Sequence, residues 1–270
     1  MFLLYRTLAS GLALLCLTAF AAAEPAALTK EEIAGATRTD DFSIPTPGEF
    51  MSALDKTGKL AWKGLYRTAI RTDFTSRPQI ALNLGTLIAD GYIAIQAKEA
   101  QSVRNVGKDI MTLAKPLSVK DKILERGKSL AEFAEKGQWD EVNEDLEAMQ
   151  NEAKSTLSEN NDADLVVLVT VGGWARGTEA ISGFVAEHYT AESAKLLRQP
   201  GIVGYLSEKL DALPEKMRDD TSVKRTRSRL NELKTAVSFG RDVTPTVDDV
   251  KKIKAIATEL IKDIAKKETK

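Results

Sequence analysis

The sequence predicts an all-α protein: an antiparallel multi-helix bundle or irregular helical array of about nine or ten helices, with two glycine-striped central helices. Three observations lead to this class. Apolar residues recur with the helical period over most of the chain, whereas no stretch alternates apolar and polar residues as a half-buried strand does. Glycine and proline stand between the periodic runs, where they end helices. Short connections of this kind join antiparallel neighbours.

The N-terminus has the pattern of a cleaved secretory signal peptide over residues 1–23. Arg6 supplies a positive charge, an apolar segment follows it, and Ala21 and Ala23 form an A-x-A cleavage site before Glu24. The apolar segment is shorter than the roughly 20 residues that cross a bilayer. We therefore expect an exported protein, in the periplasm or otherwise secreted, with no transmembrane segment once the signal is removed.

After the signal, residues 24–45 are expected to form an extended or weakly helical leader, and residues 46–270 a single all-helical domain. Three helix starts have the side-chain pattern of a capping box. They are Thr46 with Glu49, Ser76 with Gln79, and Thr246 with Asp249. The predicted helices cover residues 30–35, 47–57, 60–72, 77–98, 100–115, 119–136, 139–158, 163–187, 191–199 with 202–212, 215–239 and 247–267.

Each predicted boundary has a local cause, because glycine, proline or a polar run stands between neighbouring helices. These breaks are Gly58, Pro116, Gly137, residues 158–162, Pro200 with Gly201, Pro214 and Pro245. Around Gly137, the hairpin of residues 129–149 resembles the helix–turn–helix unit of a tetratricopeptide repeat. A solenoid needs several such units, and no period of about 34 residues recurs. Ordinary antiparallel packing is therefore the expected structure of this hairpin.

Composition excludes several chemistries. The one cysteine, Cys16, lies in the signal peptide, so we expect no thiol nucleophile, disulfide or cysteine-bound metal in the mature chain. The one histidine, His188, excludes two-histidine zinc and haem sites, and no serine elbow accompanies it. The segment starting at Asn160 lacks the glycine and glutamate of a calcium loop. With 38 basic and 39 acidic residues, the chain lacks the basic excess of a nucleic-acid-binding protein. We expect no cofactor and no metal.

Two basic segments are candidate surfaces. Residues 224–229, with the sequence KRTRSR, are expected to form a solvated helix face. The last helix, within residues 246–270, has an apolar stripe opposite several lysines, a pattern typical of helices that lie on anionic membranes. It lacks the Trp and Phe of such helices. Docking onto the bundle is therefore the main expectation, and a weak membrane-surface contact is the alternative.

Two segments that are apolar on nearly every side, residues 77–98 and 163–187, are expected to be the central helices. The apolar run in the second is too short to span a membrane, and GGWARG matches neither glycine pattern of a nucleotide-binding loop. Glycine inside a helix costs about 1 kcal/mol against alanine, which close helix packing would explain. The small residues that predict this packing are Ala81, Gly85 and Ala89 in the first helix, and Gly173, Gly177 and Ala180 in the second.

The central helices also carry polar residues, which form the candidate binding site. We expect Asp90 and Arg176 to meet between the helices, because a buried charge is costly unless it is paired. Asn83, Trp174 and Glu179 are expected near this pair. Three roles remain open: a structural salt bridge that fixes helix register, a pocket for a small anion or polar ligand, and a catalytic cluster.

The sequence therefore predicts an exported envelope protein of non-catalytic type that binds a protein partner or a small polar ligand. The alternatives are an enzyme or anion-binding sensor that uses the polar cluster, and peripheral membrane association through the C-terminal helix. A solvent-open cleft at Arg176 would favour a ligand or a substrate. A sealed salt bridge, with exposed apolar surface elsewhere, would favour a partner-binding role.

Overall fold

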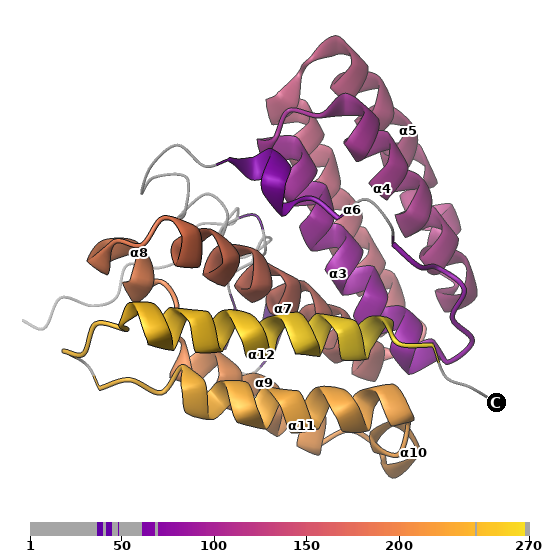
Figure 1. Ribbon diagram of the computed structural model, residues 1–270. Coiled ribbons are helices and arrows are strands. Elements are labelled where there is room, and N and C mark those ends of the chain that lie inside the picture. Colours follow the sequence, from indigo (N-terminus) through magenta and orange to yellow (C-terminus); the bar gives the residue numbers. More distant parts are fainter. Residues whose placement is uncertain are drawn as a thin grey trace, which may run out of the picture.

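The computed structural model describes residues 37–39, 42–44, 48, 61–67, 70–240 and 242–267. It confirms the all-α fold, which Figure 1 shows as a compact arrangement of packed helices. The helices are α3 (Arg77–Gln96), α4 (Ala100–Ala114), α5 (Lys120–Lys136), α6 (Trp139–Glu159), α7 (Ala163–Glu187), α8 (Ala191–Lys195), α9 (Pro200–Asp211), α10 (Glu215–Arg218), α11 (Thr221–Ala236) and α12 (Val247–Ala265), with 3-10 turns η1 (Trp62–Leu65) and η2 (Lys115–Leu117).

The helices form two groups whose most extensive contact is the crossing of α3 and α7. Helices α3, α4, α5 and α6 pack on one another, and α7, α9, α11 and α12 form the second group (Figure 1). Helix α3 packs against α7 more extensively than any other pair of described helices does. Every residue of α3 from Gln79 to Ile95 is buried, as a helix that is apolar on nearly every side requires. The crossing of α3 and α7 is therefore the centre of the fold.

Helix starts follow the capping pattern where the structure describes them. Ser76 accepts a hydrogen bond from the backbone N–H of Gln79 at 3.4 Å. Thr246 and Asp249 form a reciprocal capping box at the start of α12. Gly137 adopts a φ of 68°, a left-handed conformation that glycine tolerates, and this ends α5 two residues before α6 begins. Thr46 and Glu49, the third predicted pair, lie outside the described residues.

The helix predicted over residues 60–72 is wrong. In the part of this segment that the structure describes, residues 61–67 and 70–72, only the short turn η1 forms, and the backbone at Tyr66 is extended, with φ −76° and ψ 136°. Tertiary contacts override the helical pattern: the carbonyl of Leu65 accepts a hydrogen bond from Arg176, and the Arg67 side chain pairs with Asp90. These bonds to Arg176 and Asp90 hold the segment against the crossing of α3 and α7 in a non-helical conformation.

The helix predicted over residues 215–239 is divided into α10 and α11. The division has a local cause, because the Asp220 carboxylate accepts hydrogen bonds from the backbone N–H groups of Ser222 at 2.9 Å and Val223 at 3.4 Å. A side chain that caps free N–H groups in this way starts a new helix. The helix predicted over residues 191–199 is likewise shorter in the structure, where α8 covers Ala191–Lys195.

Two short strands lie in the segment expected to be an extended or weakly helical leader. Strand β1 (Thr37–Thr39) pairs antiparallel with β2 (Phe42–Ile44), with Arg38 opposite Ser43. Strands of three residues are too short to show an alternating pattern in sequence. The signal peptide, including its cleavage site at Ala21, Ala23 and Glu24, lies outside the described residues, as do the helix predicted over residues 30–35 and nearly all of that over 47–57.

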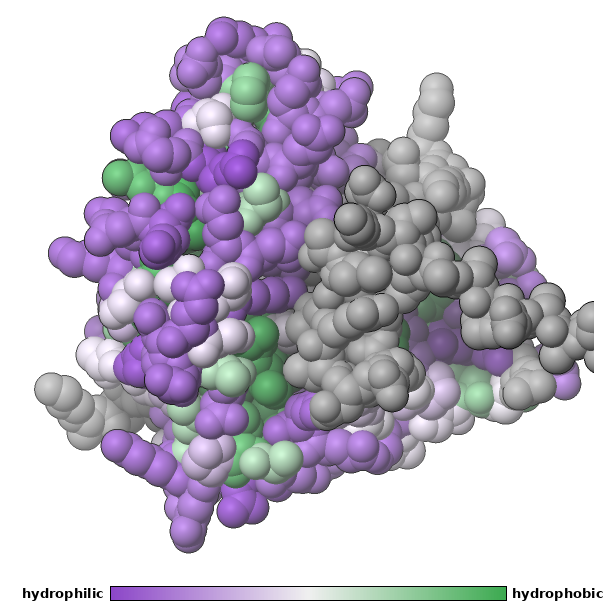
Figure 2. Space-filling view, turned by 180° about the vertical axis from the view of Figure 1, so that it is seen from behind, coloured by the Kyte–Doolittle hydropathy of each residue, from purple (hydrophilic) through white to green (hydrophobic). Residues whose placement is uncertain are grey.

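On the face that Figure 2 shows, the described residues are mostly hydrophilic, with hydrophobic side chains in small patches. In the part of the chain that the structure describes, no helix combines the length and the apolar character needed to cross a bilayer. Helix α12 packs against α7 and α11, and its apolar stripe faces the core. The buried residues of this stripe are Val250, Ile253, Ala257, Leu260, Ile261 and Ile264.

Candidate functional site

The predicted pair Asp90 and Arg176 meets where α3 and α7 cross. Arg176 donates from Nε to Asp90 Oδ1 at 2.7 Å, and the two side chains are 3% and 0% exposed. Arg67 donates from Nε to the other carboxylate oxygen of Asp90 at 2.9 Å. Glu179 accepts from Arg176 Nη1 at 3.1 Å. These four residues, Arg67, Asp90, Arg176 and Glu179, are called the ionic network below, and their charges balance.

The ionic network satisfies the hydrogen-bonding groups at its centre. Arg176 uses Nε on Asp90, Nη1 on Glu179 and Nη2 on the backbone carbonyl of Leu65. Burial alone would lower the pKa of Arg176, but the adjacent Asp90 and Glu179 carboxylates hold it above its ordinary value. Both oxygens of Asp90 are also occupied. The central pair therefore presents no free group to a ligand, and only Arg67 and Glu179, with side chains 23% and 17% exposed, reach the edge.

Asn83 lies away from the ionic network, which corrects the predicted site. Its Nδ2 donates to the carbonyls of Gln79 at 2.9 Å and Ile264 at 3.0 Å. Gln79 Nε2 donates to the carbonyls of Ile264 at 3.0 Å and Lys266 at 2.7 Å. The last carbonyls of a helix have no partner within the helix, so these amides cap α12. Asn83 precedes Asp90 by about 10 Å along the helix axis, which separates the two functions.

Trp174 is also separate from the ionic network. Its indole Nε1 donates to Gln199 Oε1 at 2.8 Å, in the segment between α8 and α9. Of the five residues predicted to share a binding site, the structure therefore brings together Asp90, Arg176 and Glu179. It adds Arg67, which sequence reasoning missed because that residue belongs to a segment predicted to be helical.

The helix crossing depends on glycine, at positions partly different from those predicted. A Cβ at Gly85 would overlap the carbonyl oxygen of Val169 and lie 2.7 Å from the backbone nitrogen of Gly173. A Cβ at Gly172 would overlap the carbonyl oxygen of Leu82. Backbone atoms cannot move aside cheaply, so both positions need glycine. Gly172 therefore occupies a role that the sequence assigned to its neighbours.

Gly173 takes part in the close approach through its backbone nitrogen, which faces Gly85, and the remaining predicted packing residues are buried. Ala81, Ala89 and Ala180 belong to the core. A Cβ at Gly177 would meet no described atom within 4 Å, so the close contact does not extend to this residue. The spacing of small residues predicted the right helix pair and Gly85, but the crossing is centred near the start of the predicted strip on α7.

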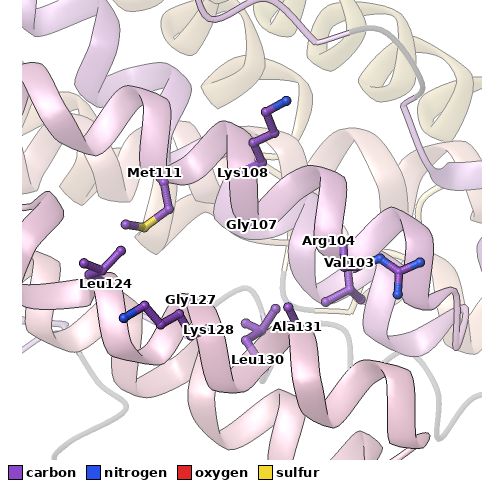
Figure 3. A pocket seen from close by; sticks show the side chains of 10 residues that line it. All are labelled: Val103, Arg104, Gly107, Lys108, Met111, Leu124, Gly127, Lys128, Leu130 and Ala131. Atoms are coloured by element: carbon purple, nitrogen blue, oxygen red, sulfur yellow. The ribbon is translucent and has the colours of Figure 1, made fainter.

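The structure reveals a different candidate site, a groove of about 340 Å³ between α4 and α5 (Figure 3). We call it the α4–α5 groove. Figure 3 shows Met111 and Leu124 at one end, and Arg104 and Ala131 at the other. The residues that line it are Val103, Arg104, Gly107, Lys108, Met111, Leu124, Gly127, Lys128, Leu130 and Ala131.

Two glycines form the middle of the α4–α5 groove. A Cβ at Gly107 would approach only the Leu130 side chain, at 3.9 Å, and a Cβ at Gly127 would lie 3.5 Å from Met111 Sδ. These are ordinary van der Waals distances, so helix packing does not require glycine at either position. Both glycines lie inside helices, where they cost about 1 kcal/mol each against alanine. Their effect is to leave the groove open. Two helix-interior glycines without a packing reason were therefore the feature of the sequence that could have predicted the groove.

The charges along the α4–α5 groove have one sign. Arg104, Lys108 and Lys128 stand among apolar residues, and none of the lining residues is acidic. Arg104 bonds to Glu135 at 2.9 Å and Lys128 to Glu125 at 2.7 Å, both exposed pairs. Lys108 forms no ion pair with any residue that the structure describes. The groove therefore combines an apolar floor with a cationic rim.

The basic segment of residues 224–229 is not an open cationic patch. Lys224 pairs with Asp219 and Arg227 with Asp211, while Arg229 contacts Asp263 at 2.9 Å. Arg225 donates to the backbone carbonyl of Asp263 near the end of α12. Three of the four basic side chains are therefore paired with carboxylates within the fold, and Arg225 is bonded to the backbone.

His188 and the acidic residues form no described metal site. His188 ends α7 at the surface, with its ring centroid 4.9 Å from that of Phe184. Among the residues that the structure describes, no group of three or more His, Cys, Asp or Glu side chains is arranged to hold a metal ion.

Fold and geometry define a helical array with an ionic network at its centre, whose Asp90–Arg176 pair is buried, and an open apolar groove at its side. Comparison with protein-family models, with curated proteins and with solved structures finds no match for this chain. The geometry and chemistry of the α4–α5 groove and the ionic network are therefore the basis for inferring function.

Proposed function

We propose that this chain is an exported, non-catalytic binding protein whose binding site is the α4–α5 groove. The observation that carries the proposal is the pair of helix-interior glycines, Gly107 and Gly127, that keep an apolar surface open where packing does not require them. Export is supported by the signal-peptide pattern of residues 1–23.

Accessibility favours the groove over the ionic network. Small-molecule sites are concave and mostly apolar, with volumes of about 300 to 1,000 Å³ and a few polar groups that orient the ligand. The α4–α5 groove, at about 340 Å³, fits the lower end of this range. At the ionic network, Arg176 already donates hydrogen bonds to Asp90, to Glu179 and to the carbonyl of Leu65. A ligand there would have to displace existing ion pairs.

The composition of the groove supports binding rather than catalysis. Its lining consists of glycine, alanine, larger apolar residues, lysine and arginine. General acid–base catalysis needs a group with a pKa near the working pH, and covalent catalysis needs an activated nucleophile. The three cations of the rim are exposed or half-buried, so no desolvated lysine is present to act as a nucleophile.

Native mass spectrometry of the exported full chain, incubated with a concentrated cell-envelope extract, tests the proposal. We expect a bound ligand on the wild-type chain and on Glu179→Gln, which alters the ionic network and the contact of Glu179 with Thr258 but no residue that lines the groove. Gly107→Leu, which fills the groove, is expected to lose that ligand while remaining folded. A ligand lost from Glu179→Gln and kept by Gly107→Leu would move the site to the ionic network. No bound ligand on any chain would contradict the proposal.

A further inference from the structure

We infer that the α4–α5 groove binds a single-chain amphiphile with an anionic head, such as a fatty acid. The inference rests on the function proposed above and specifies its ligand. Three features lead to it: the length of the groove, the flexible residues at its floor and the sign of the charges along its rim.

The shape of the groove suits one extended hydrocarbon chain. From Val103 to Met111 it follows α4 over eight residue steps, about 12 Å along the helix axis. A volume of about 340 Å³ spread over this length is narrow. A helix with its side chains is about 10 Å wide, so it could not be seated in such a space. An acyl chain lying between α4 and α5 would pass over Gly107 and Gly127.

The floor of the groove can adapt to an acyl chain. Met111 lines the groove and is half-buried, and the buried Met149 lies close to Gly127, with its Cε 3.7 Å from the position of a Cβ there. Methionine is unbranched and flexible, so it fits apolar partners of varied shape. Val103 and Leu130 are buried and give the floor a fixed apolar base. The floor can therefore contact apolar chains of different shapes.

The rim selects an anionic head over a cationic one. Arg104, Lys108 and Lys128 line the groove without any acidic residue among them. The exposed pairs of Arg104 with Glu135 and of Lys128 with Glu125 are each worth at most about 1 kcal/mol. A carboxylate or phosphate head can therefore replace these glutamates at little cost. Lys108 forms no ion pair within 4 Å among the described residues, and its neighbour Asp109 interacts with it only by a longer-range Coulomb attraction.

Calorimetric titration with dodecanoate, kept below its micelle concentration, tests the inference. We expect one dodecanoate per chain, and binding of dodecyltrimethylammonium that is weaker by about tenfold or more. The triple variant Arg104→Gln, Lys108→Gln and Lys128→Gln should weaken dodecanoate binding by a similar factor. Equal affinity for the two amphiphiles, or no binding of dodecanoate, would overturn the inference.

A matched variant controls for net charge. Lys115→Gln, Lys120→Gln and Lys122→Gln remove the same charge from residues beside the groove that do not line it. Dodecanoate affinity should change far less in this control than in the rim variant. An equal loss in both variants would show that long-range charge, rather than the rim, holds the ligand, and would contradict the inference.

Two further outcomes separate this inference from the proposed function. If dodecanoate does not bind, while a polar molecule or a peptide from the extract is lost in Gly107→Leu, the groove is a binding site with another ligand. Vesicles containing phosphatidylglycerol present the same anionic chemistry on a bilayer. If the wild-type chain floats with these vesicles and Gly107→Leu does not, the ligand is a membrane surface, and the single-chain assignment is overturned.

Discussion

The two helix pairs α3–α7 and α4–α5 both carry glycines inside their helices, yet the glycines do different things. At the α3–α7 crossing, a Cβ on Gly85 or Gly172 would overlap a backbone carbonyl oxygen of the facing helix. At the α4–α5 groove, a Cβ on Gly107 or Gly127 would meet only side chains, at 3.9 and 3.5 Å. A helix-interior glycine therefore indicates close backbone approach only when its neighbour is backbone. Where its neighbours are side chains at 3.5 Å or more, as at Gly107 and Gly127, packing does not require the glycine and the space beside it is open.

Charge divides the two regions in the same way. At the crossing, the guanidinium of Arg176 is buried and bonded through all its nitrogens, which supports a structural role. At the groove, the cations stand at the surface with weak partners or none among the described residues. The contrast predicts that changes at the crossing affect stability, whereas changes at the groove affect binding.

The largest expected loss of stability comes from Arg176→Met. It would leave Asp90 buried with Arg67 as its remaining cation, and breaking a buried pair from one side costs about 3 to 5 kcal/mol. Urea unfolding followed by circular dichroism measures the loss. Arg104→Met at the groove is the control, and as a surface change it should cost less than about 0.5 kcal/mol. Similar losses in the two variants would remove the contrast between the regions.

Gly85→Ala is expected to cost about 3 kcal/mol, at the upper end for overpacking, because the added methyl group overlaps the carbonyl of Val169. Gly172→Ala should behave alike. Gly204→Ala on α9, whose Cβ meets no described atom within 4 Å, is the matched control. Thermal unfolding of the three variants is the measurement. If Gly85→Ala were as stable as the control, close packing would not explain this glycine.

Asn83→Ala should cost about 1 to 2 kcal/mol, because the carbonyl of Ile264 loses one of its two amide donors at the end of α12. Hydrogen exchange should show faster opening of the last turn of α12 than of its first turn. The bound ligand in native mass spectrometry should be retained. Loss of that ligand without loss of stability would return Asn83 to a binding role.

Glu179 provides a pH-dependent prediction that has a direction. Burial raises the pKa of Glu179 above its ordinary value of 4.5, although Arg176 and Arg67 oppose this. The folded state then holds the proton more tightly than the unfolded state does, so this group favours folding below pH 4.5 and its contribution is lost as the pH rises through the raised pKa. The unfolding free energy of Glu179→Gln should therefore gain on that of the wild type as the pH rises above 4.5. The opposite trend in urea titrations would show that ion pairing outweighs burial.

Much of the centre of the fold could be predicted from the sequence. Helices α3 and α7 are long and apolar on nearly every side, so their burial and contact follow from the pattern. Asp90 and Arg176 stand out because a charge in such a helix needs a partner. The same reasoning did not predict the partners of Asn83 and Trp174. A residue's position on a helix face does not determine which segment packs against that turn of the helix.

The rest depends on how helices sit against one another. Gly173 and Gly177 share the small-residue face that the sequence shows, but the crossing geometry brings the neighbouring Gly172 onto the backbone of α3 and leaves Gly177 without a contact. Arg67 belongs to a segment whose helical pattern is overridden by tertiary contacts. The α4–α5 groove arises between two helices, so no single segment of sequence contains it. In the sequence, only Gly107 and Gly127 indicate the groove, because each glycine destabilises its helix relative to alanine and packing does not explain it.

The central claim is tested most directly by Gly107→Ala combined with Gly127→Ala, with both stability and dodecanoate affinity measured. Alanine favours the helix by about 1 kcal/mol per site and also fills the groove, so the account predicts higher stability with weaker binding. Gly204→Ala should raise stability and leave dodecanoate affinity unchanged. A double variant that is less stable, or one that binds dodecanoate as the wild type does, would contradict the assignment of these glycines to an open binding groove.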